Sequence, residues 1–199
     1  IVVVPVGGGG CRWAATAPVA ALGLEPGRDV GVIARAEPEN SLLEIVEGFS
    51  RKPRGMKLAV LGKYEDGNAY HQAVKAAAGN EVMFLGAIYD KKVVQALRFH
   101  SAAYVHGHQV GGTNPSLVEA LGAGNAVIAH DNRFNRWVAG PGAAFFDGAA
   151  GFATQLDAIL ADPTRLDSMR KASRERFLAE FQWEKILSEY ETLLLKYQK

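Results

Sequence analysis

The sequence contains a single cysteine, Cys11, among its 199 residues. One cysteine excludes an internal disulfide and a zinc cage built from cysteines, and it fits the reducing cytosol. A strong charge of one sign is also missing, because 22 Lys and Arg stand against 21 Asp and Glu, a formal net charge of +1. General nucleic-acid binders usually carry a marked basic excess, so we expect no nucleic-acid partner. No apolar run approaches the about 20 residues that span a bilayer, and we recognise no signal peptide.

The sequence does contain enough apolar residues for a sizeable core. Hydrophobic residues make up 48% of the chain and charged residues 22%, which is the balance of a folded globular protein. The length suits one domain, residues 1–199, and because position 1 is Ile we expect a fragment of a longer protein. Glycine is over-represented, with 22 residues, or about 11% against an average of about 7%. The positions of these glycines indicate where the backbone turns tightly or approaches a ligand.

Short apolar runs alternate with segments of helical spacing. The runs are Ile1–Pro5, Val30–Ala34, Leu58–Leu61, Val82–Leu85, Ala103–Val105, Ala126–Ala129 and Ala143–Phe146. Most are apolar throughout, as expected for parallel strands covered on both faces. The helical segments include Ser41–Ser50, Lys91–His100, Phe152–Leu160, Pro163–Glu180 and Trp183–Lys196. This alternation predicts an α/β fold, a Rossmann-like doubly wound parallel sheet with extra helices at the C-terminal end.

Two glycine-containing segments resemble phosphate-binding motifs but lack residues that these motifs require. Gly7–Gly10 follow an apolar run, but the third glycine of the dinucleotide fingerprint is missing, so we interpret them as a flexible turn. Gly62 and Lys63 resemble the end of a phosphate loop, but Tyr64 stands where Ser or Thr would hold magnesium. Neither segment predicts a nucleotide site.

His106 and His108 flank Gly107 just after a predicted strand, a spacing at which two histidines can share one face. A metal ion would need further ligands, and the sequence offers no nearby pair of carboxylates. We therefore predict no metal and keep the two histidines as candidates for a cleft. The basic segment Arg165–Arg176 also contains acidic residues, so we interpret it as a solvated helix face rather than a membrane-facing one.

The most informative stretch is YVHGHQVGGTNPSLVEALGAGNAVIAHDN, Tyr104–Asn132. It predicts a strand, a glycine-rich loop, and a helix with Asn114 as N-cap and Pro115 in its first turn. Glycines before a helix N-terminus let the backbone approach an anion closely, and phosphate is the usual occupant. Glu119, farther along the helix, could accept hydrogen bonds from a ribose diol. The alternative is an ordinary loop before a well-capped core helix, with Glu119 in solvent.

A second cluster follows the strand Val30–Ala34. Arg35 stands directly at the end of this strand, where it could clamp a diphosphate in a crevice at the carboxyl edge of the sheet. The alternative is a surface ion pair with Glu37 or Glu39. Asn40 has an ordinary role available as the N-cap of the next helix.

These segments resemble a known family. Tyr104–Asn132 is similar to the signature region of GT-B glycosyltransferases of family four, and IARAEPENSLLEIVEGF (Ile33–Phe49) is similar to their other donor-binding stretch. The segment 85–132 resembles, more narrowly, bacterial rhamnosyltransferases of capsule and cell-wall polysaccharide synthesis. The resemblance covers nearly the whole chain, is weakest over residues 1–28, and aligns with the second of the family's two Rossmann-like domains. It implies transfer of a sugar from a nucleotide-diphosphate donor, which this half of the enzyme binds.

The resemblance also implies roles for individual residues. Arg35 would contact the donor diphosphate, Glu119 would hold the ribose, and both would serve catalysis. The region around Ile88 would lie against the base. The other donor-binding positions are Asn40, Gly111, Gly112, Thr113, Asn114, Pro115 and Ser116. In the family an Arg, a Lys and a helix dipole stabilise the departing diphosphate, so the resemblance implies neither a metal nor a cofactor beside the donor substrate.

The sequence departs from the family pattern at three positions. Gly111 replaces the first of two glutamates that stand eight positions apart, and Asn40 replaces the usual Lys. Trp137 stands in the segment where a further Glu is common. The first two departures recur among the rhamnosyltransferase relatives and suit a different donor. The three departures together bear on the catalytic assignment rather than on the fold.

The interpretation that follows is the donor-binding C-terminal domain of a cytoplasmic glycosyltransferase, with rhamnose as the sugar. A polysaccharide or lipid-linked acceptor would bind an absent N-terminal domain, and association of the full-length protein with the inner face of the cell membrane is left open. One alternative is a non-catalytic module that senses a phosphorylated metabolite. Another is a GT-B-fold sugar epimerase, for which His106, His108 and His130 are the only candidate acid–base residues in the crevice.

Overall fold

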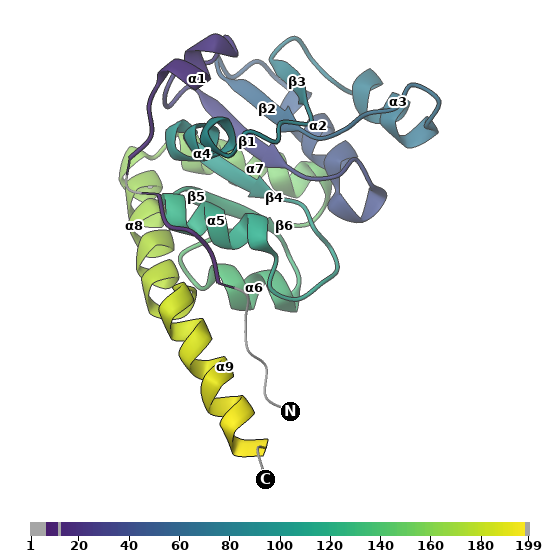
Figure 1. Ribbon diagram of the computed structural model, residues 1–199. Coiled ribbons are helices and arrows are strands. Elements are labelled where there is room, and N and C mark those ends of the chain that lie inside the picture. Colours follow the sequence, from purple (N-terminus) through teal and green to yellow (C-terminus); the bar gives the residue numbers. More distant parts are fainter. Residues whose placement is uncertain (1–6, 12, 198–199) are drawn as a thin grey trace.

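Six strands form one fully parallel sheet in the order β3-β2-β1-β4-β5-β6. They are seen in a computed structural model that describes residues 7–11 and 13–197 (Figure 1). The strands are β1 (Asp29–Ile33), β2 (Lys57–Leu61), β3 (Val82–Gly86), β4 (Ala103–His106), β5 (Ala126–His130) and β6 (Ala144–Phe146). The predicted Rossmann-like doubly wound sheet is therefore confirmed. One predicted strand, Ile1–Pro5, lies outside the described residues.

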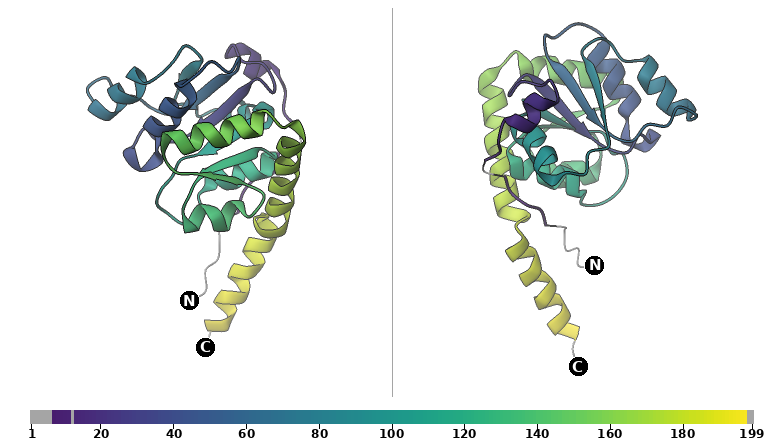
Figure 2. Two further views of the ribbon diagram at one scale, coloured as in Figure 1. Left: turned by 180° about the vertical axis from the view of Figure 1, so that it is seen from behind. Right: turned by 45° about the horizontal axis from the view of Figure 1, so that its top comes forward.

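Helices cover both faces of the sheet (Figure 2). On one face α2 (Leu42–Ser50), α3 (Ala69–Ala76) and α7 (Gly148–Leu160) pack on the strand residues Val30, Val32, Leu58, Val60 and Ile128. On the other face lie α1 (Ala17–Ala21), α4 (Lys91–His100), α5 (Pro115–Ala123) and α6 (Arg133–Ala139). The strands are buried on both sides because alternate side chains enter the two layers, which explains why their sequences are apolar throughout.

The basic segment lies on α8 (Pro163–Glu180), and three of its arginines donate hydrogen bonds to backbone carbonyls of other elements. Arg170 donates to the carbonyl of Ala102, Arg174 to that of Ala123, and Arg176 to those of Trp137 and Val138. The carbonyls of Ala123, Trp137 and Val138 belong to the last turns of α5 and α6, where helices have unpaired acceptors and attract cations. The interpretation of a purely solvated face is therefore wrong for these arginines, which link α8 to the ends of two helices.

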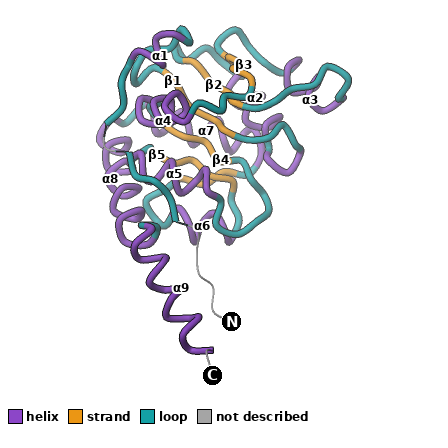
Figure 3. Tube along the Cα trace, viewed as in Figure 1, coloured by secondary structure: helices purple, strands orange, loops and turns teal. Residues whose placement is uncertain are grey.

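The last helix, α9 (Trp183–Tyr197), extends away from the body of the fold (Figure 3). Ile186 is buried, but Trp183, Leu187, Tyr190 and Leu194 are 43 to 67% exposed. Apart from Ile186, the predicted apolar face is thus largely uncovered by the described residues. Among these residues, none of the helices is both long and apolar enough to cross a membrane.

Gly7–Gly10 do not form a turn. Gly8 pairs with Gln182 in a single parallel bridge, and its N–H donates to the carbonyl of Phe181 at 3.0 Å. The segment passes so close to α5 that a Cβ on Gly122 would lie 3.0 Å from the carbonyl oxygen of Gly9. The prediction of a flexible turn is wrong, because these glycines allow close packing of an extended segment against α5, α8 and α9.

Candidate functional site

The switch point of the sheet lies between β1 and β4, because the strand order continues in opposite directions from this pair. We call the surface that the loops after these two strands form at the carboxyl edge the crevice. Ligands of open α/β sheets bind at such a switch point. The loops after the two strands are joined here: the N–H of Gln109 donates to the carbonyl of Glu39 at 2.8 Å, and its side-chain amide donates to Ser41 Oγ at 3.0 Å. Gly107 lies against the carbonyl of Asn40 so closely that no Cβ would fit. The two predicted donor-binding segments therefore form one surface.

Arg35 lies on the first of these loops, with a side chain that is 80% exposed. Its guanidinium is 3.9 Å from the carboxylate of Glu39, so the alternative of an ion pair is present. Such an exposed pair contributes about 1 kcal/mol or less. Arg35 therefore remains accessible to an anion that enters the crevice.

Asn40 does not cap the next helix as the sequence suggested. It ends a short 3-10 turn, η1 (Pro38–Asn40), and Ser41 is the residue that flanks α2. The Asn40 side chain is buried and its amide donates to the carbonyl of Arg35 at 2.9 Å. Asn40 thus fixes the backbone that carries Arg35, while its contact with a donor stays a prediction.

The start of α5 agrees with the sequence. Asn114 is the N-cap, its Oδ1 accepts from the N–H of Ser116 at 2.9 Å, and Pro115 follows. The N–H of Leu117 is bonded to the Asn114 carbonyl, so the first turn of the helix is already satisfied. In contrast, no described residue accepts a hydrogen bond from the backbone N–H of Gly112 or Thr113. The groups open to an anion are therefore those of the loop before the helix.

Gly111 explains one departure from the family pattern. Its φ is 118°, in the region that residues with a side chain rarely adopt. A glutamate at this position would strain the loop as it is folded here. The glycine is thus a requirement of the local backbone conformation.

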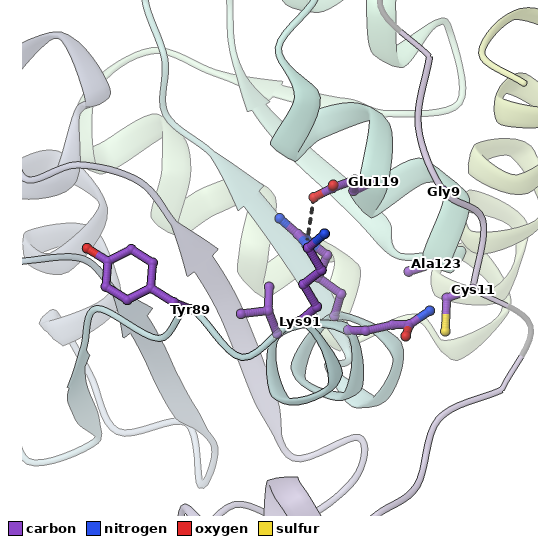
Figure 4. A pocket seen from close by; sticks show the side chains of 9 residues that line it. Gly9, Cys11, Tyr89, Lys91, Glu119 and Ala123 are labelled. Carbon is purple, nitrogen blue, oxygen red and sulfur yellow. Dashed lines mark ion pairs between the residues drawn. The ribbon is translucent and has the colours of Figure 1, made fainter. Parts of the chain in front are cut away.

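Glu119 projects from α5 at the rim of a cavity of about 410 Å³ (Figure 4). Its Oε2 is 2.7 Å from Nη1 of Arg98, an ion pair in which Arg98 is 10% exposed and Glu119 is 42% exposed. Arg98 Nη2 also donates to Ser116 Oγ at 3.0 Å, and Ser116 Oγ is 2.8 Å from the hydroxyl of Tyr104. Ser116, a predicted donor-binding residue, therefore belongs to the network that holds Arg98.

The other cavity residues come mainly from α4 and the N-terminal segment. They are Gly9, Cys11, Tyr89, Lys91, Val94, Gln95 and Ala123. In Figure 4, Tyr89 lies at one end of the cavity, and Cys11 and Ala123 lie at the other. Lys91, Gln95 and Arg98 were not among the predicted site residues, although their spacing of four and three places them on one polar face of a helix. Ile88 lies next to this region, with its side chain packed on the core.

The rings of His106 and His108 are stacked at the end of β4, with centroids 4.3 Å apart. His106 is 1% exposed, and no described residue bonds to either of its ring nitrogens. Burial, reinforced by His108, lowers the pKa of His106 well below its ordinary value. His106 is thus a neutral ring in the core, which argues against a role as an acid or base in the crevice.

His108 is half-buried and faces the first loop. Burial, followed by the charge of Arg35, lowers the pKa of His108. The carbonyl of His108 accepts from the side-chain amides of Asn132 and Asn135 at 3.0 and 2.8 Å, which adds the loop after β5 to the same surface. Within residues 7–11 and 13–197, no three His, Cys, Asp or Glu side chains gather to hold a metal ion.

Trp137, at the third departure, lies on α6 and is 47% exposed. Its ring packs edge-to-face on Phe181, and the guanidinium of Arg176 lies 5.8 Å from its centroid. These contacts give Trp137 a structural role between α6 and α8.

A family model described as glycosyl transferases group 1 matches residues 22–176. The match includes Arg35, Glu119 and the whole loop before α5. No curated protein matches the chain.

Several solved structures have the same fold as this chain. Sucrose-phosphate synthase from Thermosynechococcus elongatus superposes with a TM-score of 0.81 at 20% identity, over 97% of this chain and 51% of that one. The Anabaena protein HepE, in complex with UDP, gives a TM-score of 0.79 at 16% identity, over 91% and 52%. The C-terminal domain of LpcC, a glycosyl transferase group 1 family protein from Francisella tularensis, gives 0.73 at 15% identity, over 88% and 96%. The chain thus spans about half the length of the first two structures and nearly all of the third.

Proposed function

Because the chain belongs to the glycosyl transferases group 1 family, we propose that it binds the nucleotide-diphosphate sugar from which a GT-B glycosyltransferase transfers its sugar. The observation that carries this proposal is the set of groups at the switch point between β1 and β4. There the accessible Arg35 and the free N–H groups of Gly112 and Thr113 follow neighbouring strands. A diphosphate needs such a combination of a planar cation and backbone donors.

In the proposed mechanism, Arg35 and the loop before α5 stabilise the negative charge that develops on the departing diphosphate. The N-terminus of α5 adds the positive end of its dipole. These groups are positioned before the reaction, since Asn40 holds the Arg35 backbone and Gln109 joins the two loops. We propose that this chemistry proceeds without a metal.

We assign the ribose of the donor to Glu119 and the base to the region of Ile88. Glu119 is accessible at the rim of a cavity of about 410 Å³, which has room for a nucleoside. The Anabaena relative of similar fold was solved with UDP, which makes a nucleoside diphosphate a reasonable ligand for this chain as well.

The sugar and the acceptor extend the proposal further. The amino-acid sequence of Gly111–Asn132 resembles that of rhamnosyltransferases. This resemblance favours rhamnose as the transferred sugar and a polysaccharide or lipid-linked molecule as the acceptor. We place acceptor binding in a preceding N-terminal domain, against which the exposed apolar side chains of α9 would pack. We propose that the chain alone binds the donor nucleotide but does not transfer the sugar, and we place the full-length enzyme in the cytoplasm or at the inner face of the membrane.

Calorimetric titration of the chain with dTDP, UDP, GDP and NADH tests this function. We expect dTDP or UDP to bind selectively, and the Arg35→Ala variant to lose most of that affinity. Lys171→Ala is the matched control, since Lys171 is an exposed cation that is ion-paired with Glu175 four residues along α8. Equal binding by wild type and Arg35→Ala would contradict the proposed diphosphate contact. Sugar transfer by the isolated chain would contradict its proposed inactivity.

A further inference from the structure

Arg98 joins the interior of the domain to the cavity. Its guanidinium contacts Glu119 Oε2 at 2.7 Å and Ser116 Oγ at 3.0 Å, and Ser116 Oγ in turn lies 2.8 Å from the hydroxyl of Tyr104. Tyr104 is fully buried on β4. A chain of polar contacts thus runs from a core strand to the carboxylate at the rim of the cavity.

The main chain at Arg98 is held as firmly as its side chain. The side-chain amide of Asn125 donates to the Arg98 carbonyl at 2.6 Å and joins the end of α4 to the start of β5. Only 10% of the Arg98 side chain is exposed, against 42% for Glu119. The arginine is therefore the fixed partner of the pair, and the carboxylate is the partner that reaches the cavity.

We propose that Arg98 is a positioning residue for the donor nucleotide: it holds the Glu119 carboxylate in the orientation that accepts the ribose hydroxyls. This inference rests on the proposed function, because it takes Glu119 to be the ribose contact. A glutamate on an exposed helix surface samples several rotamers, and binding then costs the entropy of ordering it. The ion pair with a rigid guanidinium removes much of that cost before the ligand arrives.

The alternative is that Arg98 only stabilises the packing of α4 on α5. That role would affect all ligands equally, through the fraction of folded protein or the shape of the cavity. A positioning role would affect only ligands with ribose hydroxyls. The two roles are separated by a pair of ligands that differ in those hydroxyls alone.

The test is calorimetric titration of the chain with the tighter-binding of UDP and dTDP, and with the same nucleotide whose free sugar hydroxyls, 2′ and 3′ in UDP and 3′ alone in dTDP, are replaced by hydrogen. We expect wild type to prefer the hydroxylated ligand. Arg98→Met, which keeps the apolar stem, should reduce this preference about tenfold while affinity for the deoxygenated ligand stays unchanged. Glu119→Gln should have a similar effect, and adding Arg98→Met to it should cause little further loss.

Two further variants support the interpretation. Arg98→Lys keeps a cation that can reach Glu119, so it should recover part of the preference. Arg54→Met is the matched control, because it removes a buried arginine from an ion pair with Asp157 on α7, outside the cavity, and should leave both affinities unchanged. Thermal unfolding of each variant shows whether the fold is retained.

The possible failures are distinguishable. If Arg98→Met keeps the full preference, or weakens both ligands equally, the positioning role is overturned while donor binding stands. If wild type binds nucleotide without regard to the hydroxyls, the inference also fails, because Glu119 then does not contact the ribose. If wild type binds neither UDP nor dTDP, the proposed function itself is contradicted and this inference with it.

Discussion

The imidazole rings of His106 and His108 lie face to face at the end of β4, with centroids 4.3 Å apart and planes at 8° to each other. The inner ring, His106, has no bonding partner among the described residues for either nitrogen. It therefore behaves as an apolar ring below the crevice, and a proton on it would be buried without compensation.

We predict that this burial makes the stability of the domain depend on pH. Burial lowers the folded-state pKa of His106 well below 6.5, so the unfolded chain takes up the proton first as the pH falls. The contribution of His106 is therefore fully present above about pH 6.5 and is lost as the pH falls below it. The uptake of one such proton on unfolding gives the free energy of unfolding a slope of about 1.4 kcal/mol per pH unit.

His106→Phe, which keeps a ring but cannot titrate, should flatten this slope. The measurement is the free energy of unfolding by urea at several values between about pH 5 and pH 7.5. His108→Phe should flatten the slope as well, because burial also lowers the pKa of His108. An unchanged slope in His106→Phe would show that the ring is protonated equally in the folded and unfolded chain.

Gly107→Ala should destabilise the domain and disturb the crevice. Its Cβ would collide with the backbone carbonyl of Asn40 and with the side chain of Ile45, so the two loops at the switch point would have to separate. We expect a loss of about 2 kcal/mol in the free energy of unfolding, together with weaker nucleotide binding. Gly67→Ala is the control, since a Cβ there meets nothing within 4 Å. Equal stability of the two variants would contradict the close approach.

Gly111→Glu, which restores the first glutamate of the family pattern, should not improve the site. At a φ of 118° any side chain strains the backbone, by about 1–2 kcal/mol. The new carboxylate would also repel a diphosphate bound at the adjacent N–H groups. Urea unfolding and nucleotide titration measure the two effects, and Gly111→Ala separates the strain from the charge. A variant that is as stable as wild type and binds nucleotide more tightly would contradict this account of the departure.

The sequence predicted the elements whose signals are local. Apolar runs located the six described strands, and the cap at Asn114 with Pro115 located the start of α5. α1, α3 and α6 were missed because they are short, with 5, 8 and 7 residues. Local patterns therefore predicted the strands and their succession along the chain. They did not predict every helix that covers the sheet.

The misassigned residues depend on partners that are distant in sequence. Gly7–Gly10 were taken for a turn because nothing nearby indicates that they pack on α5 and α8. Arg98 was missed because its partners, Ser116 and Glu119, lie on another helix. Asn40 was predicted to cap α2, but the chain forms a 3-10 turn before this helix. The side-chain amide of Asn40 donates instead to the carbonyl of Arg35. Spacing alone does not reveal such tertiary contacts.

The place where the nucleotide binds can be mapped by nuclear magnetic resonance. Two-dimensional amide spectra of the isotope-labelled chain would be recorded during titration with UDP or dTDP. We predict that the resonances of Gly112, Thr113 and the residues lining the cavity beside Glu119 shift together. Shifts confined to Phe177, Leu178 and Trp183, which line a separate cavity between α8 and α9, or no shift with either nucleotide, would contradict a donor site at the carboxyl edge of the sheet.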